Sequence, residues 1–269
     1  MKRFNGSDTA NDFTVFVTSH VGRVRGNNED NFALNSLSKK LEFDNVNFVK
    51  EVSQPFLAAV FDGMGGEAKG EYASEIAASA AKELYTRTCK SGCDDFEQEA
   101  NRFVTLANNR IRNFLEENRC GTGGSTVAAV IVKNGIAYPF SMGDSRIYLL
   151  RSGKLLQISK DHTLAQKKVD ANIYTPEEAM RSYDSHKLTK FLGVDCDMEG
   201  LEAEYYDSVC IQNDDMLLLC SDGLYDEVSD KEIARTMTDY PENPSLELVR
   251  TAIKNGGSDN ITCVVINGK

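Results

Sequence analysis

The sequence is dominated by short apolar runs that have the length of β-strands and are separated by turn residues. Two of these runs flank Asn134-Gly135, and Ser152-Gly153 marks a second turn of the kind found in tight hairpins. Strands joined by such short turns pair in antiparallel fashion. The pattern therefore predicts antiparallel sheets built from residues 13–21, 56–61, 126–132, 136–142, 147–150, 208–211, 216–220 and 261–266.

Two longer segments, residues 67–87 and 95–117, carry apolar side chains at helical spacing. β-hairpins, with long helices between some of the strands along the chain, predict the α+β class rather than a doubly wound fold. The polar stretch 36–54 is expected to form a long hairpin turn without a function of its own. No repeat, low-complexity stretch or Pro- or Gly-rich linker divides the chain, so residues 1–269 are expected to form one domain.

Charge, apolar segments and cysteine spacing exclude several classes of binding partner and site. The formal net charge of -11 argues against a nucleic-acid or anionic-membrane surface, which needs basic patches. We find neither a signal peptide nor a run of roughly 20 apolar residues that could span a membrane. Cys89 and Cys93 form a close pair without a second pair, which makes a poor zinc site. Reduced cysteines in a cytoplasmic protein are the expectation, and nothing in the sequence demands more than a monomer.

Aspartates stand next to glycine or serine at four places where apolar strands begin or end: Asp62, Asp144, Asp222 and Asp259. A single aspartate of this kind usually marks a turn, but four of them would place carboxylates that repel one another at strand ends. Something cationic should hold them together. Oxygen ligands without clustered histidine or cysteine select magnesium, manganese or calcium. Because no EF-hand loop is present, the pattern favours Mg²⁺ or Mn²⁺.

Two such ions would lower the pKa of a water molecule and aim it at phosphorus. Arg25, five residues before Asp30, is the candidate for gripping the phosphate, and its alternative interpretation is a solvated surface arginine. The histidines, His20, His162 and His186, are scattered, and neither a Gly-x-Ser-x-Gly elbow nor a Cys-x5-Arg loop is present. The predicted reaction therefore uses water directly, without a phosphoenzyme.

Taken in order, five segments resemble the metal-dependent serine/threonine protein phosphatases, the type 2C family, in its bacterial branch. Each segment is a weak motif alone, but five in this order are specific, and they extend over most of the chain. The resemblance implies a four-layer sandwich in which two antiparallel β-sheets pack face to face with helices on both outer sides. The matching segments are Arg-Gly-Asn-Asn-Glu-Asp (25–30), Phe-Asp-Gly-Met-Gly-Gly (61–66), Gly-Asp-Ser-Arg (143–146), Leu-Cys-Ser-Asp-Gly-Leu (219–224) and Gly-Ser-Asp-Asn-Ile-Thr (257–262).

The resemblance also implies metal ligands. Asp62 would bridge two Mn²⁺ or Mg²⁺ ions, with the carbonyl of Gly63 as a further ligand. Asp222 and Asp259 would complete the second ion. Asp144, again with Asp222, would suit a third ion found in bacterial-type members.

For the substrate, the resemblance implies that Arg25 holds the phosphate, while Glu29 and Asp30 hold Arg25 or water molecules at the metals. Residues 161–190 would form a flap beside the site. The substrates would be phosphoserine and phosphothreonine in proteins, those of a cognate serine/threonine kinase. Met64 stands where some members carry a histidine proposed as the general acid, so no side chain is assigned that role. The flap has residues 182–187 in place of the usual His-Pro-x-Arg-Asn run, which leaves substrate preference open.

Two other function classes are compatible with the residues. A non-catalytic regulatory module that binds phosphoproteins should have lost metal carboxylates, and none is missing here. A two-metal nuclease or phosphodiesterase could use the same carboxylates, but the acidic surface does not attract nucleic acid. Calorimetric titration with manganese and a choice between plasmid and phosphopeptide substrates distinguish these classes.

Overall fold

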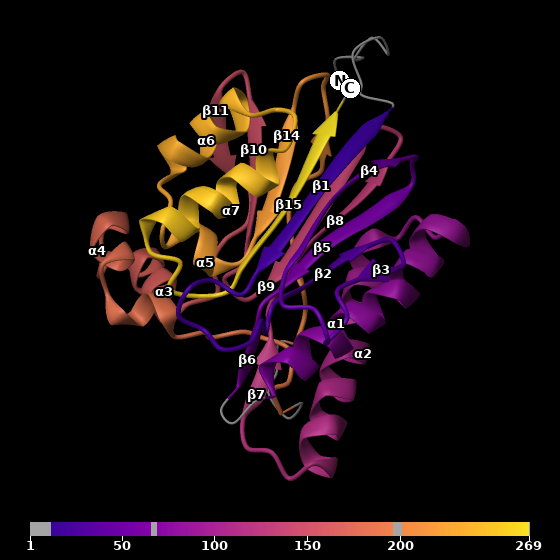
Figure 1. The fold of residues 1–269 in the computed structure, drawn as a ribbon. Coiled ribbons are helices and arrows are strands. Elements are labelled where there is room, and N and C mark those ends of the chain that lie inside the picture. Colours follow the sequence, from indigo (N-terminus) through magenta and orange to yellow (C-terminus); the bar gives the residue numbers. More distant parts are fainter. Residues whose placement is uncertain (1–11, 66–68, 196–200, 269) are drawn as a thin grey trace.

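Two antiparallel β-sheets form the centre of the computed structural model, which describes residues 12–65, 69–195 and 201–268 (Figure 1). In the first sheet, β1 and β15, which are the first and last described strands along the chain, lie side by side. Phe13 stands opposite Gly268, and His20 stands opposite Ile261. The strand order of this sheet is β11 (Lys154–Gln157), β10 (Arg146–Arg151), β14 (Met216–Cys220), β15 (Ile261–Gly268), β1 (Phe13–His20) and β4 (Val46–Val52).

The second sheet is built around the hairpin of β8 and β9. Asn134 and Gly135 turn this hairpin with φ angles of 53° and 71°, as the sequence predicts. The strand order is β12 (Glu204–Tyr205), β9 (Ile136–Met142), β8 (Val127–Lys133), β5 (Phe56–Phe61), β2 (Asn31–Leu34) and β3 (Leu37–Ser38), and β13 (Val209–Cys210) also pairs with β9. A separate small ribbon joins β6 (Gly63–Gly65) to β7 (Gly123–Ser125).

The inner faces of the two sheets pack against each other. Along β5, Phe56, Ala58 and Val60 face the first sheet, whereas the alternate residues Leu57 and Phe61 face the helices on the other side. Because side chains alternate along a strand, burial on both faces makes such a strand apolar throughout. This is why the sequence of β5 has no polar position.

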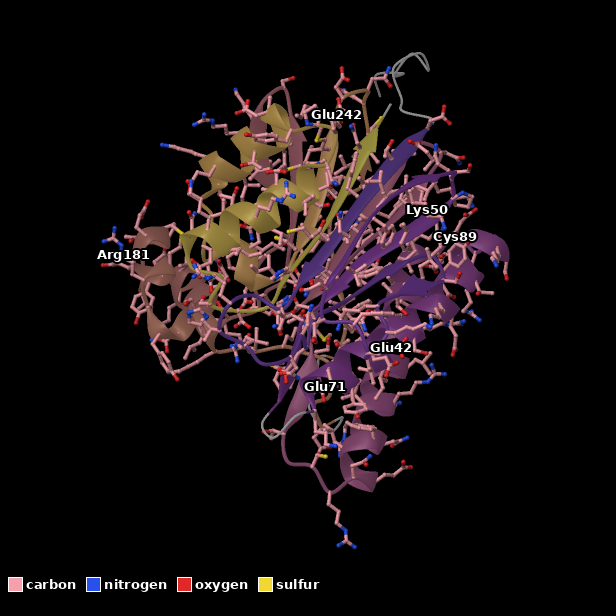
Figure 2. The ribbon with its side chains drawn as sticks, viewed as in Figure 1. Glu42, Lys50, Glu71, Cys89, Arg181 and Glu242 are labelled. Atoms are coloured by element: carbon pink, nitrogen blue, oxygen red, sulfur yellow. The ribbon has the colours of Figure 1, made fainter. Side chains whose placement is uncertain are left out.

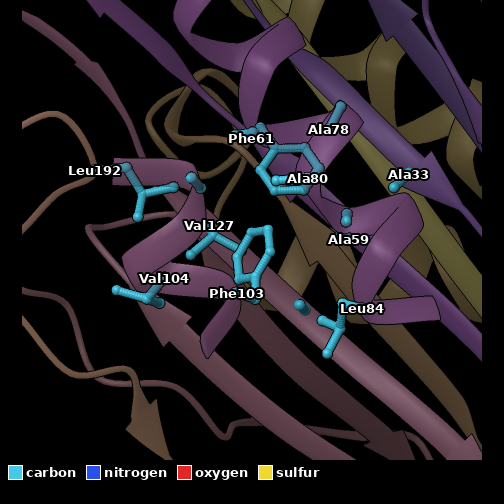
Figure 3. Packing of buried hydrophobic residues seen from close by; sticks show 14 of the residues in the cluster. Ala33, Ala59, Phe61, Ala78, Ala80, Leu84, Phe103, Val104, Val127 and Leu192 are labelled. Carbon is cyan, nitrogen blue, oxygen red and sulfur yellow. The ribbon is translucent and has the colours of Figure 1, made fainter. Parts of the chain in front are cut away.

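Two long helices, α1 (Gly70–Tyr85) and α2 (Phe96–Glu117), cover the outer face of the second sheet. Phe61 of β5, Phe103 of α2 and Val127 of β8 meet in this layer (Figure 3). Asp95 caps α2 by accepting a hydrogen bond of 3.1 Å from the backbone N–H of Gln98. A short π-helix, Thr86–Lys90, follows α1.

The outer face of the first sheet is covered by α5 (Asp222–Tyr225), α6 (Asp230–Asp239) and α7 (Pro244–Asn255). Ser229 and Glu232 form a capping box at the start of α6. Helices therefore flank both sheets, and the predicted α+β sandwich with four layers is confirmed (Figure 1).

One sequence prediction is wrong. The stretch 36–54 was expected to be a hairpin turn, yet it contains β3 and the seven-residue strand β4. β4 is the last strand of its sheet, and most of its residues are not buried, so it has no clear apolar alternation. The predicted helix start at residue 67 lies outside the described residues; the described part of α1 begins at Gly70.

Three short helices lie between β11 and β12 and project beside the α5 end of the molecule (Figure 1). They are α3 (Leu164–Asp170), α4 (Pro176–Met180) and η2 (Tyr183–His186), all within the predicted flap. Among the labelled surface residues, Glu42, Lys50, Arg181 and Glu242 are exposed, and Arg181 stands at the end of α4 (Figure 2). Within the described ranges, no helix combines the length and apolarity that crossing a bilayer requires.

Candidate active site

A cavity of about 500 Å³ lies where the strand ends and loops of the two sheets converge. The loop after β1, the end of β5, the β9–β10 turn, the start of α5 and the loop before β15 all contribute to its wall. Asp30 is the one predicted site residue that does not line it. The predicted residues that do are Arg25, Glu29, Asp62, Gly63, Asp144, Asp222 and Asp259. The fold thus brings the acidic strand ends together, and their roles as ligands stay predictions.

Asp62 directly follows β5, and its backbone is fixed by Thr126 of the neighbouring chain segment. The N–H of Asp62 donates to Oγ1 of Thr126 at 2.9 Å, and the N–H of Thr126 donates to the carbonyl oxygen of Asp62, also at 2.9 Å. The Thr126 hydroxyl is in addition 2.7 Å from the Ser145 hydroxyl. These bonds continue the pairing of β5 with β8 past the last ladder residue, so the position of Asp62 is set by the sheet.

Gly63 is required by close backbone approach. A Cβ atom at this position would lie 2.2 Å from the carbonyl oxygen of Gly70 and 2.5 Å from that of Glu29. Both neighbours are backbone atoms that cannot move away without shifting α1 or the Glu29 loop. The glycine therefore allows the start of α1 and the Glu29 loop to pack directly against the segment that carries Asp62.

Asp30 lies behind the cavity wall and is only 1% exposed. Its Oδ2 accepts a hydrogen bond of 2.7 Å from Oγ of Ser221, and the Ser221 hydroxyl accepts one of 2.9 Å from the N–H of Thr262. Ser221 immediately precedes Asp222 at the start of α5. Asp30 therefore fixes the segment that presents Asp222 and does not itself face the cavity.

Asp144 is buried in the β9–β10 turn, and its backbone carbonyl accepts a hydrogen bond of 3.0 Å from the Tyr225 hydroxyl. Arg146, two residues later, lies over the Tyr225 ring at 3.6 Å from the ring centre. The Arg146 guanidinium donates to Asp161 at 2.7 Å, so its charge is already matched. Arg146 therefore forms its salt bridge with Asp161 and acts on Asp144 only through its charge.

The Arg25 loop is anchored by Asn260. The N–H of Glu29 donates to Oδ1 of Asn260 at 2.8 Å, and Nδ2 of Asn260 donates to the carbonyls of Val21 and Asn27 at 2.9 Å each. Arg25 itself is half exposed at the rim, and its Nη2 donates to Oδ2 of Asp259 at 2.5 Å. A guanidinium in this place can reach either the carboxylate or an anion in the cavity.

Burial and mutual repulsion disfavour the charged forms of the cavity carboxylates and of Asp30 behind the cavity wall. Burial is the largest cause in each case, and neighbouring carboxylates add to it. Together they raise the pKa of Asp222 to about 6 and that of Asp30 to about 7, and they raise the pKa values of Asp62 and Asp144 well above the ordinary value. Carboxylates in such a position need either protons or bound cations.

The donor set fits hard divalent ions. Four aspartates and Gly63 line the cavity, without a cluster of thiols or imidazoles among the described wall residues. Mg²⁺ and Mn²⁺ prefer such oxygen ligands. Burial and, after it, repulsion among the carboxylates raise the pKa values of Asp62 and Asp222, and a divalent ion bound between them would offset both effects.

Two residues near the carboxylates were not predicted from the sequence. His186 of η2 lines the cavity, and its Nδ1 lies 3.9 Å from Oδ2 of Asp226. His186, Asp222 and Asp226 each place one potential ligand atom within 4.8 Å of the others. Asp226 lies four residues after Asp222, a spacing that puts two side chains on one face of a helix, and this was the available signal. Nothing in the sequence indicates where His186 lies.

The predicted flap contributes to the cavity wall through His186 and Leu188. At its base, Thr163 forms an antiparallel bridge with Leu188, and Ser125 forms another with Leu192. Met64, which stands in the place of a possible general acid, also lines the cavity and has no proton to donate.

Comparison with known proteins gives consistent matches. The family model described as protein phosphatase 2C matches residues 38–254. The chain is 34% identical over 221 residues to the serine/threonine protein phosphatase PstP of Mycobacterium tuberculosis, a match that covers 78% of this chain and 40% of the relative. It is 30% identical over 251 residues to the serine/threonine phosphatase stp of Listeria monocytogenes, covering 91% of this chain and 92% of the relative.

Solved structures agree with these matches. The crystal structure of M. tuberculosis PstP/Ppp superimposes with a TM-score of 0.78 at 31% identity, covering 95% of this chain and 98% of that one. The catalytic domain of PstP in complex with two manganese ions gives a TM-score of 0.75 at 30% identity, with the same coverage of 95% and 98%. The chain thus corresponds to about 40% of the length of full PstP and to nearly all of its crystallised part.

Proposed function

Because the chain belongs to the protein phosphatase 2C family, whose relatives described above are named serine/threonine phosphatases, we propose that it hydrolyses phosphoserine and phosphothreonine in proteins. The observation that carries the proposal is that Asp62, Asp222 and Asp259 line one cavity together with Arg25. Water attacks phosphorus directly in this proposal, since the described residues that line the cavity include no serine or cysteine that could act as a nucleophile.

The aspartates are the proposed metal ligands. Asp62, the Gly63 carbonyl, Asp222 and Asp259 would hold two Mn²⁺ or Mg²⁺ ions, and Asp144 with Asp222 would hold a third. Bound there, the ions supply a more acidic water and positive charge for the phosphoryl oxygens. The complex of the PstP catalytic domain with two manganese ions supports the two-ion part of this assignment, as do the four aspartates that line this cavity.

The remaining residues would bind and position. Arg25 would hold the phosphate at the rim, where its side chain is 53% exposed and can exchange Asp259 for an anion. Glu29 would position water or Arg25 from the cavity wall, and Asp30 would keep Ser221 and hence Asp222 in place. No side chain is assigned as general acid.

The wider setting is also part of the proposal. Residues 1–269 would form one phosphatase domain with a flap at residues 161–190, and the protein would act as a cytoplasmic monomer on substrates of a cognate serine/threonine kinase. Free cysteines among the described residues, including Cys89, Cys93 and the buried Cys220 and Cys263, support a reducing location.

The decisive test is hydrolysis of a phosphothreonine peptide with and without divalent metal. We expect release of phosphate with Mn²⁺ and none above background with EDTA, together with tight manganese binding by calorimetry. A non-catalytic module would bind the peptide without cleaving it. Cleavage of plasmid DNA but not of the peptide would instead show a phosphodiesterase and contradict the proposal.

Replacing Arg25 by lysine tests the phosphate-binding role. Lysine keeps the charge but cannot grip two oxygens at once, so we expect KM for the phosphopeptide to rise about tenfold while kcat changes less. Steady-state kinetics measure both. Arg23→Lys is the matched control, because the exposed Arg23 does not line the cavity. An equal effect of both substitutions would rule out a specific role for Arg25.

A further inference from the structure

A groove continues from the active-site cavity along the flap. His186 lines both this cavity and an adjoining hollow of about 430 Å³. Met180 and Tyr225 line that hollow and also a wider one of about 670 Å³ between the flap helices and α6. The shared residues show that the three hollows adjoin. A chain whose phosphorylated residue enters the cavity can therefore leave it along this groove.

The floor of the groove is a guanidinium whose charge is already matched. Arg146 donates to Asp161 through Nε at 3.0 Å and Nη2 at 2.7 Å, and its Nη1 donates to the Tyr148 hydroxyl at 3.0 Å. Its remaining face lies over the Tyr225 ring. With Nε, Nη1 and Nη2 engaged, Arg146 is not available as a second phosphate site.

The far end of the groove is apolar on its flap side, whereas Asp230 and Lys231 line the opposite side. Ala165 and Val169 of α3, with Pro176, Ala179 and Met180 of α4, form the flap side of the wider hollow. The Met180 residue is 70% exposed, which is unusual for a long apolar side chain with apolar neighbours around it. An apolar side chain of a bound partner would cover it and remove that surface from water.

The middle of the groove is acidic. Asp226, Glu227 and Glu232 line the hollow next to His186. Arg146 is neutralised by Asp161, so the charge of this section is negative unless His186 is protonated. Complementary charge on a partner would be basic, and it would sit between the phosphorylated residue and the apolar end.

We propose that this groove binds the substrate chain beside the phosphorylated residue, taking a basic side chain near Asp226 and Glu232 and an apolar side chain beside Met180. The inference rests on the proposed phosphatase function and adds a substrate class to it. The occupant is an extended phosphoprotein segment whose phosphoserine or phosphothreonine is separated by a basic residue from an apolar one.

Phosphothreonine peptides that differ at two positions test this inference in the manganese-loaded enzyme. A parent peptide carries arginine and then leucine beside the phosphothreonine, and it is made with this pair on either side because the groove does not fix the chain direction. Replacing leucine by alanine should lower kcat/KM about tenfold. Replacing arginine by glutamate should lower it as well, and the effect should shrink at high salt.

Met180→Glu is the test variant, and Ile173→Glu is its matched control. Ile173 is 65% exposed on the same flap but does not line the groove. We expect Met180→Glu to abolish the preference for leucine over alanine, whereas Ile173→Glu retains it. Hydrolysis of 4-nitrophenyl phosphate, which has no flanking chain, should be unchanged in both variants.

The outcomes separate the two proposals. If the wild-type enzyme cleaves all peptides equally well, the groove inference is overturned while the phosphatase function stands. If it cleaves neither peptides nor 4-nitrophenyl phosphate with manganese, both are overturned. An oligomer that dissociates on Met180→Glu would show that a second copy of the chain occupies the groove, which would also contradict the inference.

Discussion

Replacing Asp222 by asparagine is expected to lower kcat/KM for a phosphothreonine peptide by on the order of a thousandfold, while making the metal-free protein more stable. The loss follows because asparagine keeps the shape of the side chain but removes the charge that would hold a divalent ion. The gain in stability follows because burial, with repulsion from Asp226 and Asp259, raises the pKa of Asp222 to about 6. An uncharged side chain avoids this penalty.

The size of the stability change follows from linkage. The pKa of Asp222 rises from the ordinary value of 3.8 to about 6, and after allowance for its partial exposure this corresponds to about 2 kcal/mol at neutral pH. Peptide kinetics and chemical denaturation in EDTA measure the two effects separately. Asp207→Asn, at an exposed position outside the cavity, should change neither. A variant that loses both activity and metal-free stability would mean that Asp222 serves the fold and not a metal.

Removing metal is expected to make the protein less stable as the pH rises. The pKa values of Asp222 and Asp30 are about 6 and about 7 in the folded protein, above the value of about 4 in an unfolded chain. A raised carboxyl pKa means that the folded state binds the extra proton. Its contribution is therefore complete below about pH 4 and is lost as the pH rises through 6 and 7.

We expect the metal-free protein to lose on the order of 3 kcal/mol of unfolding free energy between about pH 5 and pH 8, as these carboxylates ionise against one another. Saturating Mn²⁺ should reverse the trend, because metal binds the ionised carboxylates and stabilises the folded state more at higher pH. Thermal unfolding with EDTA or Mn²⁺ across this pH range measures both curves. Parallel curves would contradict a metal site built from these residues.

The strands that could be predicted from the sequence are those whose burial requires apolar residues at most positions. β5 is buried on both faces and is apolar at every position, so its six residues 56–61 are found correctly. β4 pairs with β1 on one side and is exposed along much of its length, so its sequence reads as a polar turn. An edge strand is held in place by hydrogen bonds to the strand it pairs with. Its own residues therefore do not show that it is a strand.

The residues of the candidate site likewise fall into those that the sequence predicts and those that it does not. Aspartates directly after apolar strands could be located from the sequence because sheet geometry brings strand ends together. The position of His186 could not be predicted, because it depends on how the flap places this residue next to Asp222 and Asp226. Asn260 stands within a recognised segment, yet its three hydrogen bonds to the Arg25 loop appear only when residues more than 200 positions apart meet. The family resemblance is confirmed.

The two neighbouring residues Ser125 and Thr126 have a mechanical consequence. Ser125 exchanges backbone hydrogen bonds of 2.9 and 2.8 Å with Leu192 at the foot of the flap, while Thr126 holds the backbone of Asp62. One short stretch of chain thus clamps the flap on one side and a cavity aspartate on the other. A displacement of the flap helices that left the Ser125–Leu192 hydrogen bonds intact would leave Thr126, and with it the backbone of Asp62, in place.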